Sequence, residues 1–350
     1  MTYTELNERE KNILRYIIQQ FILTASPVGS RNITKRYDLG ISPATVRNIM
    51  SDLEESGFID HPHTSAGRVP TDKGYRFYVD SLMNIQIIDH DDKNFIDREF
   101  ENKIDVKDEL LKVASNILSK ITRQIACVTY PRLESGTLEK LQLISLSSTR
   151  VLVVISIKGG LVKTITIEFN SEIKEQQIHT VQNLLNERLV GLSFKEIRAT
   201  FNERFSDIGD DHKAIIRLFL NSADKVFKDT RSNENIFITG AKNVIQQPEF
   251  EDPIRFQSVV ELIEDKDIIV HILDKSEEIN SDDVYISIGK ENEDQKLIDY
   301  SLITKEYKIG DVSGHLGIIG PKRMEYSKVI AIVDYVAKML TETLKNEIMK

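Results

Sequence analysis

The segment 28–76 limits the possible folds of this chain more than any other stretch of the sequence. Ser42 is a typical N-cap residue and Pro43 follows it at the first helical position, so a helix is predicted to begin at Pro43. A shorter helix over 30–37 precedes it, and Gly40 supplies the backbone freedom that a tight turn between the two helices requires. The spacing therefore predicts two short helices that meet at a turn.

A hairpin and a further helix are predicted directly after this pair. Gly57 is a typical residue to end the second helix, because glycine tolerates the positive φ that follows a helix C-terminus. The segments 58–60 and 68–70 are predicted strands, and the loop between them is rich in small, basic and histidine residues. Thr71 is a candidate N-cap for the next helix. Apolar residues at helical spacing over 6–23 predict one more helix ahead of the pair.

One face of the helix that begins at Pro43 is apolar, which leaves a second face exposed to solvent. The apolar face consists of Val46, Ile49, Met50 and Leu53. The exposed face is expected to consist of Thr45, Arg47, Asn48, Ser51 and Asp52. Arginine can donate two hydrogen bonds to a guanine edge, and asparagine can pair in the same way with adenine. This face is therefore suited to reading DNA in the major groove.

Phosphate contacts are expected from the helix N-terminus and from the hairpin. Ser42, Ser51 and the N-terminus of the helix itself can hold phosphates. In the hairpin, the residues that can reach the DNA backbone or the minor groove are His61, His63, Thr64, Ser65 and Arg68. The predicted DNA-binding residues are Ser42, Thr45, Arg47, Asn48, Ser51, His63, Ser65 and Arg68. The alternatives for this segment are a solvated helix face and a protein-interaction module.

The distribution of charge agrees with a DNA-binding segment attached to an acidic protein. The chain of 350 residues has a formal net charge of −9. Residues 1–80 contain ten Lys and Arg and ten Asp and Glu, so residues 81–350 carry the whole excess of negative charge. Between Pro27 and Met50, four basic residues stand against one acidic residue, Asp38. A locally basic head on an acidic body favours DNA binding through one region only.

The remainder of the chain alternates between predicted strands and helices, which indicates a mixed α/β body. The predicted strands are 138–146, 151–158, 162–169, 236–239, 268–273, 284–288, 302–307 and 316–319. The predicted helices are 110–121, 172–189, 193–205, 213–227 and 326–344. Residues 85–108 are charged and weakly periodic, as in a linker or a solvated helix. The helical block from about 191 to 231 is predicted to be an inserted unit suited to self-association, and the alternative is that its helices cover the sheet.

Three weaker patterns do not support a catalytic or metal site. His61-x-His63 offers too few ligands for a metal ion. The glycine-rich segment 314–323 fits neither phosphate-binding fingerprint, so a tight strand-to-helix corner is predicted there. Cys127 lies among apolar residues and is predicted to be a core residue. We therefore expect no enzymatic activity, no cofactor and no metal ion.

Composition indicates an intracellular protein. Hydrophobic residues make up 40% of the chain and charged residues 29%, as in ordinary globular proteins. The single cysteine excludes an intramolecular disulfide framework and favours a reducing cytosol. No apolar run reaches the roughly 20 residues that a membrane span needs, so a cytoplasmic protein without membrane contact is expected.

Three blocks of the sequence together resemble the family of the heat-inducible transcription repressor HrcA. The blocks are Ser42–Asp80, Ile236–Phe250 and Gly314–Ile330, so the resemblance reaches the start, the middle and the end of the chain. It implies an α+β multidomain fold with an N-terminal winged helix-turn-helix and a GAF-like α/β domain that carries an inserted helical dimerisation domain. The expected division is a DNA-binding domain over 1–84, a linker over 85–108, a GAF-like domain over 109–190 and 236–350, and an inserted dimerisation domain over 191–235.

The resemblance also implies a specific function. Repressors of this family act as homodimers at an inverted-repeat operator upstream of chaperone operons. The GroEL chaperonin keeps them active, and heat stress, which fills the chaperonin with misfolded proteins, removes that activity. We therefore expect a cytoplasmic repressor of heat-shock operons whose partners are double-stranded operator DNA, GroEL and a second copy of the chain. The alternative is a winged-helix regulator whose GAF-like domain senses a small molecule.

Overall fold

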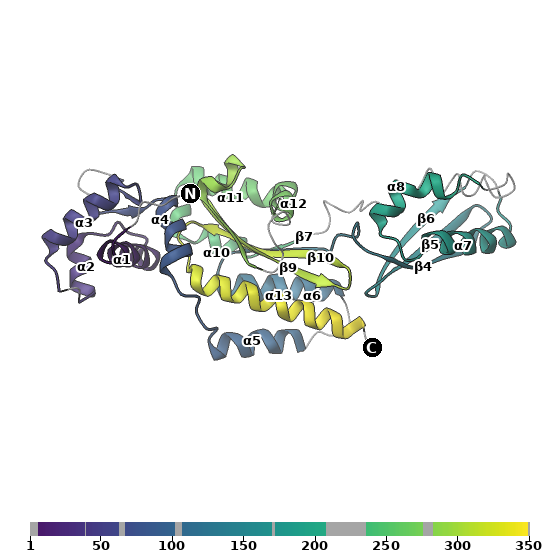
Figure 1. Ribbon diagram of the computed structural model, residues 1–350, viewed down its shortest axis with the longest axis horizontal. Coiled ribbons are helices and arrows are strands. Elements are labelled where there is room, and N and C mark those ends of the chain that lie inside the picture. Colours follow the sequence, from purple (N-terminus) through teal and green to yellow (C-terminus); the bar gives the residue numbers. More distant parts are fainter. Residues whose placement is uncertain are drawn as a thin grey trace.

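The computed structural model describes residues 6–38, 40–62, 67–101, 107–169, 172–207, 236–275 and 283–348. Three regions follow one another along its longest axis (Figure 1). The head, residues 6–83, consists of helices and a two-stranded hairpin. The body is built around a five-stranded sheet, and the inserted lobe, residues 133–207, around a three-stranded sheet. This mixture of helices and sheets confirms the predicted α+β class.

The head contains the helices and strands that the sequence predicts. Its elements are α1 (Glu8–Thr24), α2 (Ser30–Arg36), α3 (Pro43–Glu55), β1 (Ile59–Asp60), β2 (Val69–Pro70), α4 (Asp72–Phe77) and the π-helical turn η1 (Tyr78–Leu82). Capping explains where two of the helices begin: Ser42 Oγ accepts the Thr45 N–H at 3.1 Å, and Thr71 Oγ1 accepts the Gly74 N–H at 3.1 Å. α1 and α3 pack through buried apolar side chains. These are Ile13, Leu14, Ile17 and Ile18 of α1 and Val46, Met50 and Leu53 of α3.

The body is a five-stranded antiparallel sheet with helices on both faces. Its strands are β3 (Ile125–Thr129), β7 (Ile236–Thr239), β8 (Tyr285–Ile288), β9 (Tyr300–Ile309) and β10 (Val312–Pro321), in the spatial order β7-β3-β10-β9-β8. One face is covered by α6 (Lys107–Thr122) and α13 (Tyr326–Ile348), on which α5 (His90–Glu101) packs (Figure 1). The other face is covered by α10 (Ala241–Ile245), α11 (Pro253–Glu264) and α12 (Lys266–Lys275). Among the described residues, short 3₁₀ turns connect these elements, namely η2 (Pro248–Phe250), η4 (Gly289–Glu291) and η5 (Gln295–Leu297).

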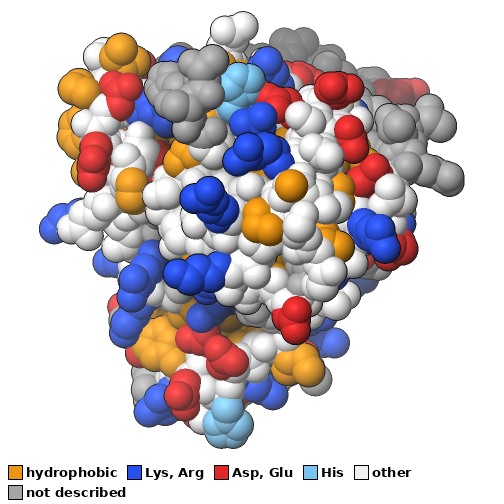
Figure 2. All heavy atoms as spheres, turned by 90° about the vertical axis from the view of Figure 1, so that its left-hand side faces the viewer, with side chains coloured by type: hydrophobic (Ala, Val, Ile, Leu, Met, Phe, Trp, Pro, Cys, Tyr) orange, Lys and Arg blue, Asp and Glu red, His pale blue; other side chains and the backbone are white. Residues whose placement is uncertain are grey.

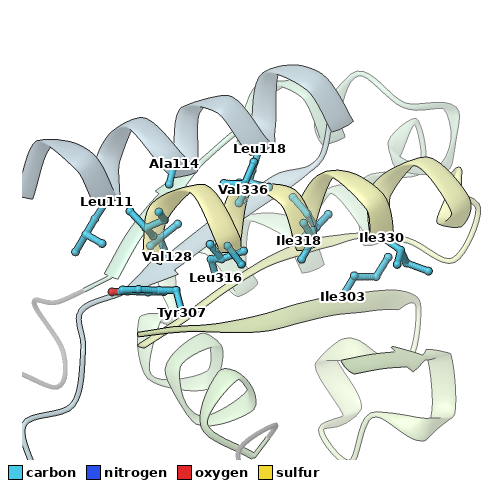
Figure 3. Packing of buried hydrophobic residues seen from close by; sticks show 14 of the residues in the cluster. Leu111, Ala114, Leu118, Val128, Ile303, Tyr307, Leu316, Ile318, Ile330 and Val336 are labelled. Atoms are coloured by element: carbon cyan, nitrogen blue, oxygen red, sulfur yellow. The ribbon is translucent and has the colours of Figure 1, made fainter. Parts of the chain in front are cut away.

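Alternating side chains produce one core on each face of the sheet. In β3, Ala126 and Val128 join the core beneath α6 and α13, whereas Ile125 and Cys127 join the core beneath α11 and α12. Figure 3 shows the first core, in which labelled side chains from α6, β3, β9, β10 and α13 point toward one another. The prediction that Cys127 is a core residue is confirmed, and burial raises the pKa of its thiol to about 12.

The inserted lobe lies between β3 and β7 in the sequence. It comprises β4 (Leu138–Ser147), β5 (Arg150–Ile157), β6 (Leu161–Glu168), α7 (Glu175–Leu189) and α8 (Phe194–Arg204). Its strands pair only with one another among the described strands. The expected division placed β4, β5 and β6 in one domain with the strands after residue 236, and it began the inserted unit at residue 191. In the structure, these three strands instead form a sheet of their own, separate from the five-stranded sheet. Tight turns such as the one at Gly159 and Gly160 force neighbouring strands to pair, but alternation in the sequence does not identify the sheet that they join.

Two segments of the body differ from their predicted secondary structure. The prediction of a strand over 268–273 is wrong, because these residues lie in α12 and bury Ile269 and Leu273, four positions apart, against the sheet. Residues 90–101 form α5, whose Ile96 and Phe100 are buried. This part of the expected linker 85–108 is therefore a packed helix rather than a free connection.

The glycine-rich segment 314–323 is mainly strand. Gly314 and Gly317 lie inside β10, where the side chains of Tyr307 and Thr304 occupy the space that a Cβ would need. The chain turns toward α13 only after Pro321. The predicted helix 213–227 lies outside the described residues. Among the helices that the structure describes, none is long and apolar enough to cross a bilayer.

Candidate nucleic-acid interface

α3 turns its predicted polar face to solvent. The exposed residues of this face are Thr45, Arg47, Asn48, Ser51 and Asp52. Ser42 is exposed as well, but its hydroxyl lies 3.0 Å from Thr45 Oγ1 and caps the helix. Figure 2 faces the end of the molecule that carries the head, and Lys and Arg side chains gather across the middle of that surface. The polar face of α3 therefore lies on a surface that also carries positive charge.

α2 packs against α3 and carries further basic residues. Arg31, Lys35 and Arg36 are all exposed. Arg36 Nη1 donates to Gln20 Oε1 of α1 at 2.7 Å, which orients its guanidinium at the junction of the two helices. A DNA-binding surface needs exposed cations that contact phosphates, beside side chains that can hydrogen-bond to base edges. α2 and α3 together present both kinds of group.

Arg68 is placed differently from the other predicted residues. Its backbone pairs with Val28, with N–O distances of 2.8 and 2.9 Å, and its Nη2 lies 2.6 Å from Glu54 Oε2. Its side chain is 24% exposed, so it is half-buried rather than free in solvent. Gly67 is needed beside it, because a Cβ there would lie 2.6 Å from the Val28 carbonyl carbon. Arg68 thus joins the hairpin to the last turn of α3.

Glu54 also contacts the hairpin at its other strand. His61 Nδ1 forms a short contact with a carboxylate oxygen of Glu54, and it lies 3.9 Å from Asp60 Oδ1. Glu54, Asp60 and His61 bring three possible metal-ligand atoms together, but the Glu54 carboxylate already pairs with Arg68. We therefore interpret the cluster as a brace for the hairpin. The predicted DNA-binding residues His63 and Ser65 lie outside the described residues.

An ion-pair network attaches the head to the body. Arg76 Nε donates to Glu291 Oε1 at 2.8 Å, and its Nη2 donates to the Ile286 carbonyl at 2.8 Å. Asp72 pairs with Lys322 at 2.7 Å and accepts the Lys290 N–H at 3.0 Å.

A second anchor joins the end of α1 to the turn before α13. Arg323 Nη1 donates to the Ile22 carbonyl at 2.6 Å and also pairs with Glu249. Tyr75 and Tyr326 lie nearby with their ring centroids 5.9 Å apart, and burial raises the pKa of both hydroxyls. Sequence reasoning missed the contacts between head and body, because their partners stand more than 200 positions apart and no local pattern connects them.

Comparisons with known proteins agree with the resemblance seen in the sequence. The family model described as HrcA protein C terminal domain matches residues 108–330 of this chain. The heat-inducible transcription repressor HrcA of Chlorobium phaeobacteroides (strain BS1) is 44% identical over 352 residues, which cover 98% of this chain and 100% of that protein. The repressor of the same name from Prosthecochloris aestuarii (strain DSM 271 / SK 413) is 42% identical, with 99% of each chain covered.

The fold also has a counterpart among solved structures. A crystal structure of a hypothetical protein at 2.2 Å resolution is similar with a TM-score of 0.59 and 22% identity, covering 98% of this chain and 100% of the other. Since the family model spans more than half of the sequence and the named relatives match it almost from end to end, the chain belongs to the HrcA family.

Proposed function

We propose that this protein is a transcription repressor that binds DNA through its head as a winged helix. α3 enters the major groove, and the β1–β2 hairpin is the wing beside it. The observation that carries the proposal is the exposed face of α3, on which Thr45, Arg47, Asn48 and Ser51 lie opposite the buried side chains that hold the helix. The names of the relatives, which are transcription repressors, support the same assignment. We assign the protein no enzymatic reaction.

The operator and its regulation belong to the same proposal. A homodimer presents two recognition helices related by a two-fold axis, so its operator is an inverted repeat. We infer that this operator lies upstream of heat-shock chaperone operons and that the repressor acts in the cytoplasm. The words "heat-inducible" in the relatives' name support the link to heat shock. The GroEL chaperonin maintains the active form of the repressor, and heat stress abolishes the repressor's activity. Marginal stability suits this scheme, because a loss of about 1–2 kcal/mol changes the active fraction several-fold.

The body and the inserted lobe have separate roles in this scheme. The five-stranded sheet with helices on both faces supports a GAF-like assignment for the body. The lobe is our candidate for the dimer contact. Ile144 on β4 and Val162 on β6 are 47% and 60% exposed, so apolar surface remains available on the lobe for a second copy.

The test is a gel shift with Arg47→Ala on a duplex from the protein's own chaperone promoter. Losing a two-bond contact to a base costs about 1–3 kcal/mol, so we expect affinity to fall roughly 5- to 150-fold. Affinity for a scrambled duplex changes much less. Arg255→Ala is the matched control, because Arg255 is also exposed but lies on α11 of the body. Unchanged operator affinity in Arg47→Ala would remove α3 from the role of recognition helix.

A footprint of the same promoter with and without chaperonin tests the remaining parts. Protection of an inverted repeat is expected, and its two halves report the symmetry of the bound dimer. Protection that strengthens when GroEL is added supports the chaperonin relation. A single protected half-site, or protection that is indifferent to GroEL, contradicts those parts without affecting the role of α3.

A further inference from the structure

A wide cleft lies at one edge of the body, where β7 is the last strand of the sheet. Its volume is about 1810 Å³. The walls come from the end of α6, from β7 and α10, and from the turn before α13. Ile22 at the end of α1 and Arg323 line it too, so the cleft reaches the joint between head and body. The function proposed above does not use it.

Unpaired positive charge surrounds this cleft. Four of its lining residues are exposed cations for which the described part of the chain provides no ion pair. They are Lys120, Arg123, Lys242 and Lys266. Two further lining cations, Arg323 and Lys328, already pair with Glu249 and Asp92. Lys120 lies over the Phe95 ring, with its Nζ 4.2 Å from the ring centroid, but the described residues provide no carboxylate for any of the four cations. Such a concentration of cations in the part of the chain that carries the whole net charge of −9 points to an anionic occupant.

The corner of the cleft is built by close backbone contacts. Arg123 has a φ of +56°, a left-handed conformation that L side chains rarely adopt. Gln247 holds it there by donating Nε2 to the Arg123 carbonyl at 3.1 Å, and Asn243 Nδ2 donates to the Ser119 carbonyl at 3.1 Å. Gly240 allows the two segments to meet, because a Cβ would lie 2.1 Å from the Gln124 carbonyl oxygen. The position of Arg123 is therefore imposed by its neighbours.

β7 offers a second kind of binding group along the wall of the cleft. Among the described strands it pairs only with β3, so its other edge has no strand partner in that part of the chain. Phe237, Ile238 and Thr239 are half-exposed and line the cleft. An open edge strand presents backbone N–H and C=O groups to which an extended peptide can add.

We propose that this cleft binds an extended acidic peptide segment of a partner protein. The segment adds to β7 through backbone hydrogen bonds and places its carboxylates at Lys120, Arg123, Lys242 and Lys266. Alternate residues of a strand point to opposite sides, so acidic residues alternating with apolar ones fit a cleft with a cationic rim and an apolar strand wall. The volume supports a peptide over a small ligand, because pockets for drug-sized molecules measure roughly 300–1,000 Å³.

Fluorescence anisotropy with a labelled peptide of alternating Glu and Val tests this proposal on the full chain. The cleft variant is Lys242→Glu with Lys266→Glu. Its control is Lys174→Glu with Lys195→Glu, which makes the same charge change at exposed sites at the starts of α7 and α8, away from the proposed dimer contact. We expect the cleft variant to bind the peptide about tenfold or more weakly, while the control binds like the parent. Equal weakening in both variants would show that only the net charge matters and would overturn the site.

A second peptide tests the strand edge. Methyl groups on alternate backbone nitrogens leave the carboxylates in place but remove the donors that pair with β7. We expect this peptide to bind at least tenfold more weakly, and hydrogen exchange to slow in residues 236–239 only with the parent peptide. Equal binding of both peptides contradicts strand addition.

Two competitors separate other occupants. Displacement of the peptide by micromolar tripolyphosphate would reassign the cleft to a small phosphate ligand. An equal loss of affinity for a scrambled 20-base-pair duplex in the cleft variant would reassign it to DNA. If no peptide binds at all, the four cations only protect the strand edge from pairing, and the proposal is refuted. None of these outcomes depends on operator recognition by α3, which Arg47→Ala tests separately.

Discussion

Arg76→Ala is expected to loosen the attachment of the head to the body. The guanidinium joins α4 to Glu291 and to the Ile286 carbonyl, and its side chain is only 19% exposed. A hydrogen bond to a charged group contributes about 1.5–3 kcal/mol when it is shielded from water. Glu291 is 37% exposed, so water partly replaces the hydrogen bonds that its carboxylate loses in the variant. We therefore discount the lost attachment free energy to about 2 kcal/mol. This corresponds to roughly a 30-fold shift toward the detached head.

Hydrogen exchange followed by mass spectrometry measures this shift directly. Amides in α4 and in residues 286–291 are expected to exchange faster in Arg76→Ala, whereas amides in the core of α1 exchange as before. Arg76→Lys keeps the charge but loses the planar fork, so an intermediate effect is expected. Asp80→Ala is the control, because it removes only an exposed contact at 3.3 Å from Arg76 Nη1, worth well under about 1 kcal/mol.

Two results would refute this reasoning. Unchanged exchange in Arg76→Ala would mean that the head is held mainly by the contacts of Asp72 and Arg323. An equally large effect of Asp80→Ala would mean that Glu291 is not the partner that matters.

Three further predictions concern the hairpin, the pH dependence and the sheet. We infer that Arg68 positions the hairpin through Glu54, so Arg68→Ala and Glu54→Gln should weaken operator binding to a similar extent. The slope of log affinity against log salt concentration should stay unchanged in both variants. If Arg68 instead contacts a phosphate directly, the magnitude of that slope should fall by about 0.9 in Arg68→Ala. Burial lowers the pKa of His315 to about 4, below its unfolded value of 6.5. The unfolded chain therefore binds the additional proton first, and the neutral ring contributes stability that is complete above pH 6.5 and is lost as the pH falls through 4. Urea unfolding between pH 4 and 7 should show a loss of up to about 3 kcal/mol that His315→Gln abolishes, and equal pH profiles would contradict it. Gly317→Ala should cost about 1–3 kcal/mol, since its Cβ would lie 2.7 Å from Thr304 Cγ2, whereas Gly29→Ala meets nothing within 4 Å and should leave the midpoint of thermal unfolding nearly unchanged.

Local signals account for the parts of the molecule that sequence reasoning predicted correctly. Ser42 and Pro43 begin α3 where expected, because a cap hydroxyl and a fixed φ act within a few residues of each other. Gly57 has a φ of +75° directly after that helix, as a residue beyond a C-cap should. The exposed face of α3 follows from the same helical spacing, so the candidate residues on it needed no tertiary information.

Longer-range partnerships account for the errors. Ile269 and Leu273 belong to a β-branched run that is typical of a strand, and they became helical because α12 buries them against the sheet. The residues of β4 were recognised as a strand, but their sheet was not, since alternation is the same in either sheet. The DNA contact of Arg68 stays a prediction, but nothing near Arg68 in the sequence indicated that Glu54 would also pair with it.

By itself, the sequence determined the head, its outward-facing residues and membership of the HrcA family, because caps, glycines and helical spacing act between near neighbours and the family pattern extends along the whole chain. Only the tertiary structure decided which strands share a sheet, how Arg76 fastens the head to Glu291, and where four exposed cations gather beside β7, whose outer edge has no strand partner among the described residues. Such contacts join residues as many as 301 positions apart. Their free energy depends on distance and solvent exposure in the folded chain, and neither quantity is encoded in any local pattern of residues.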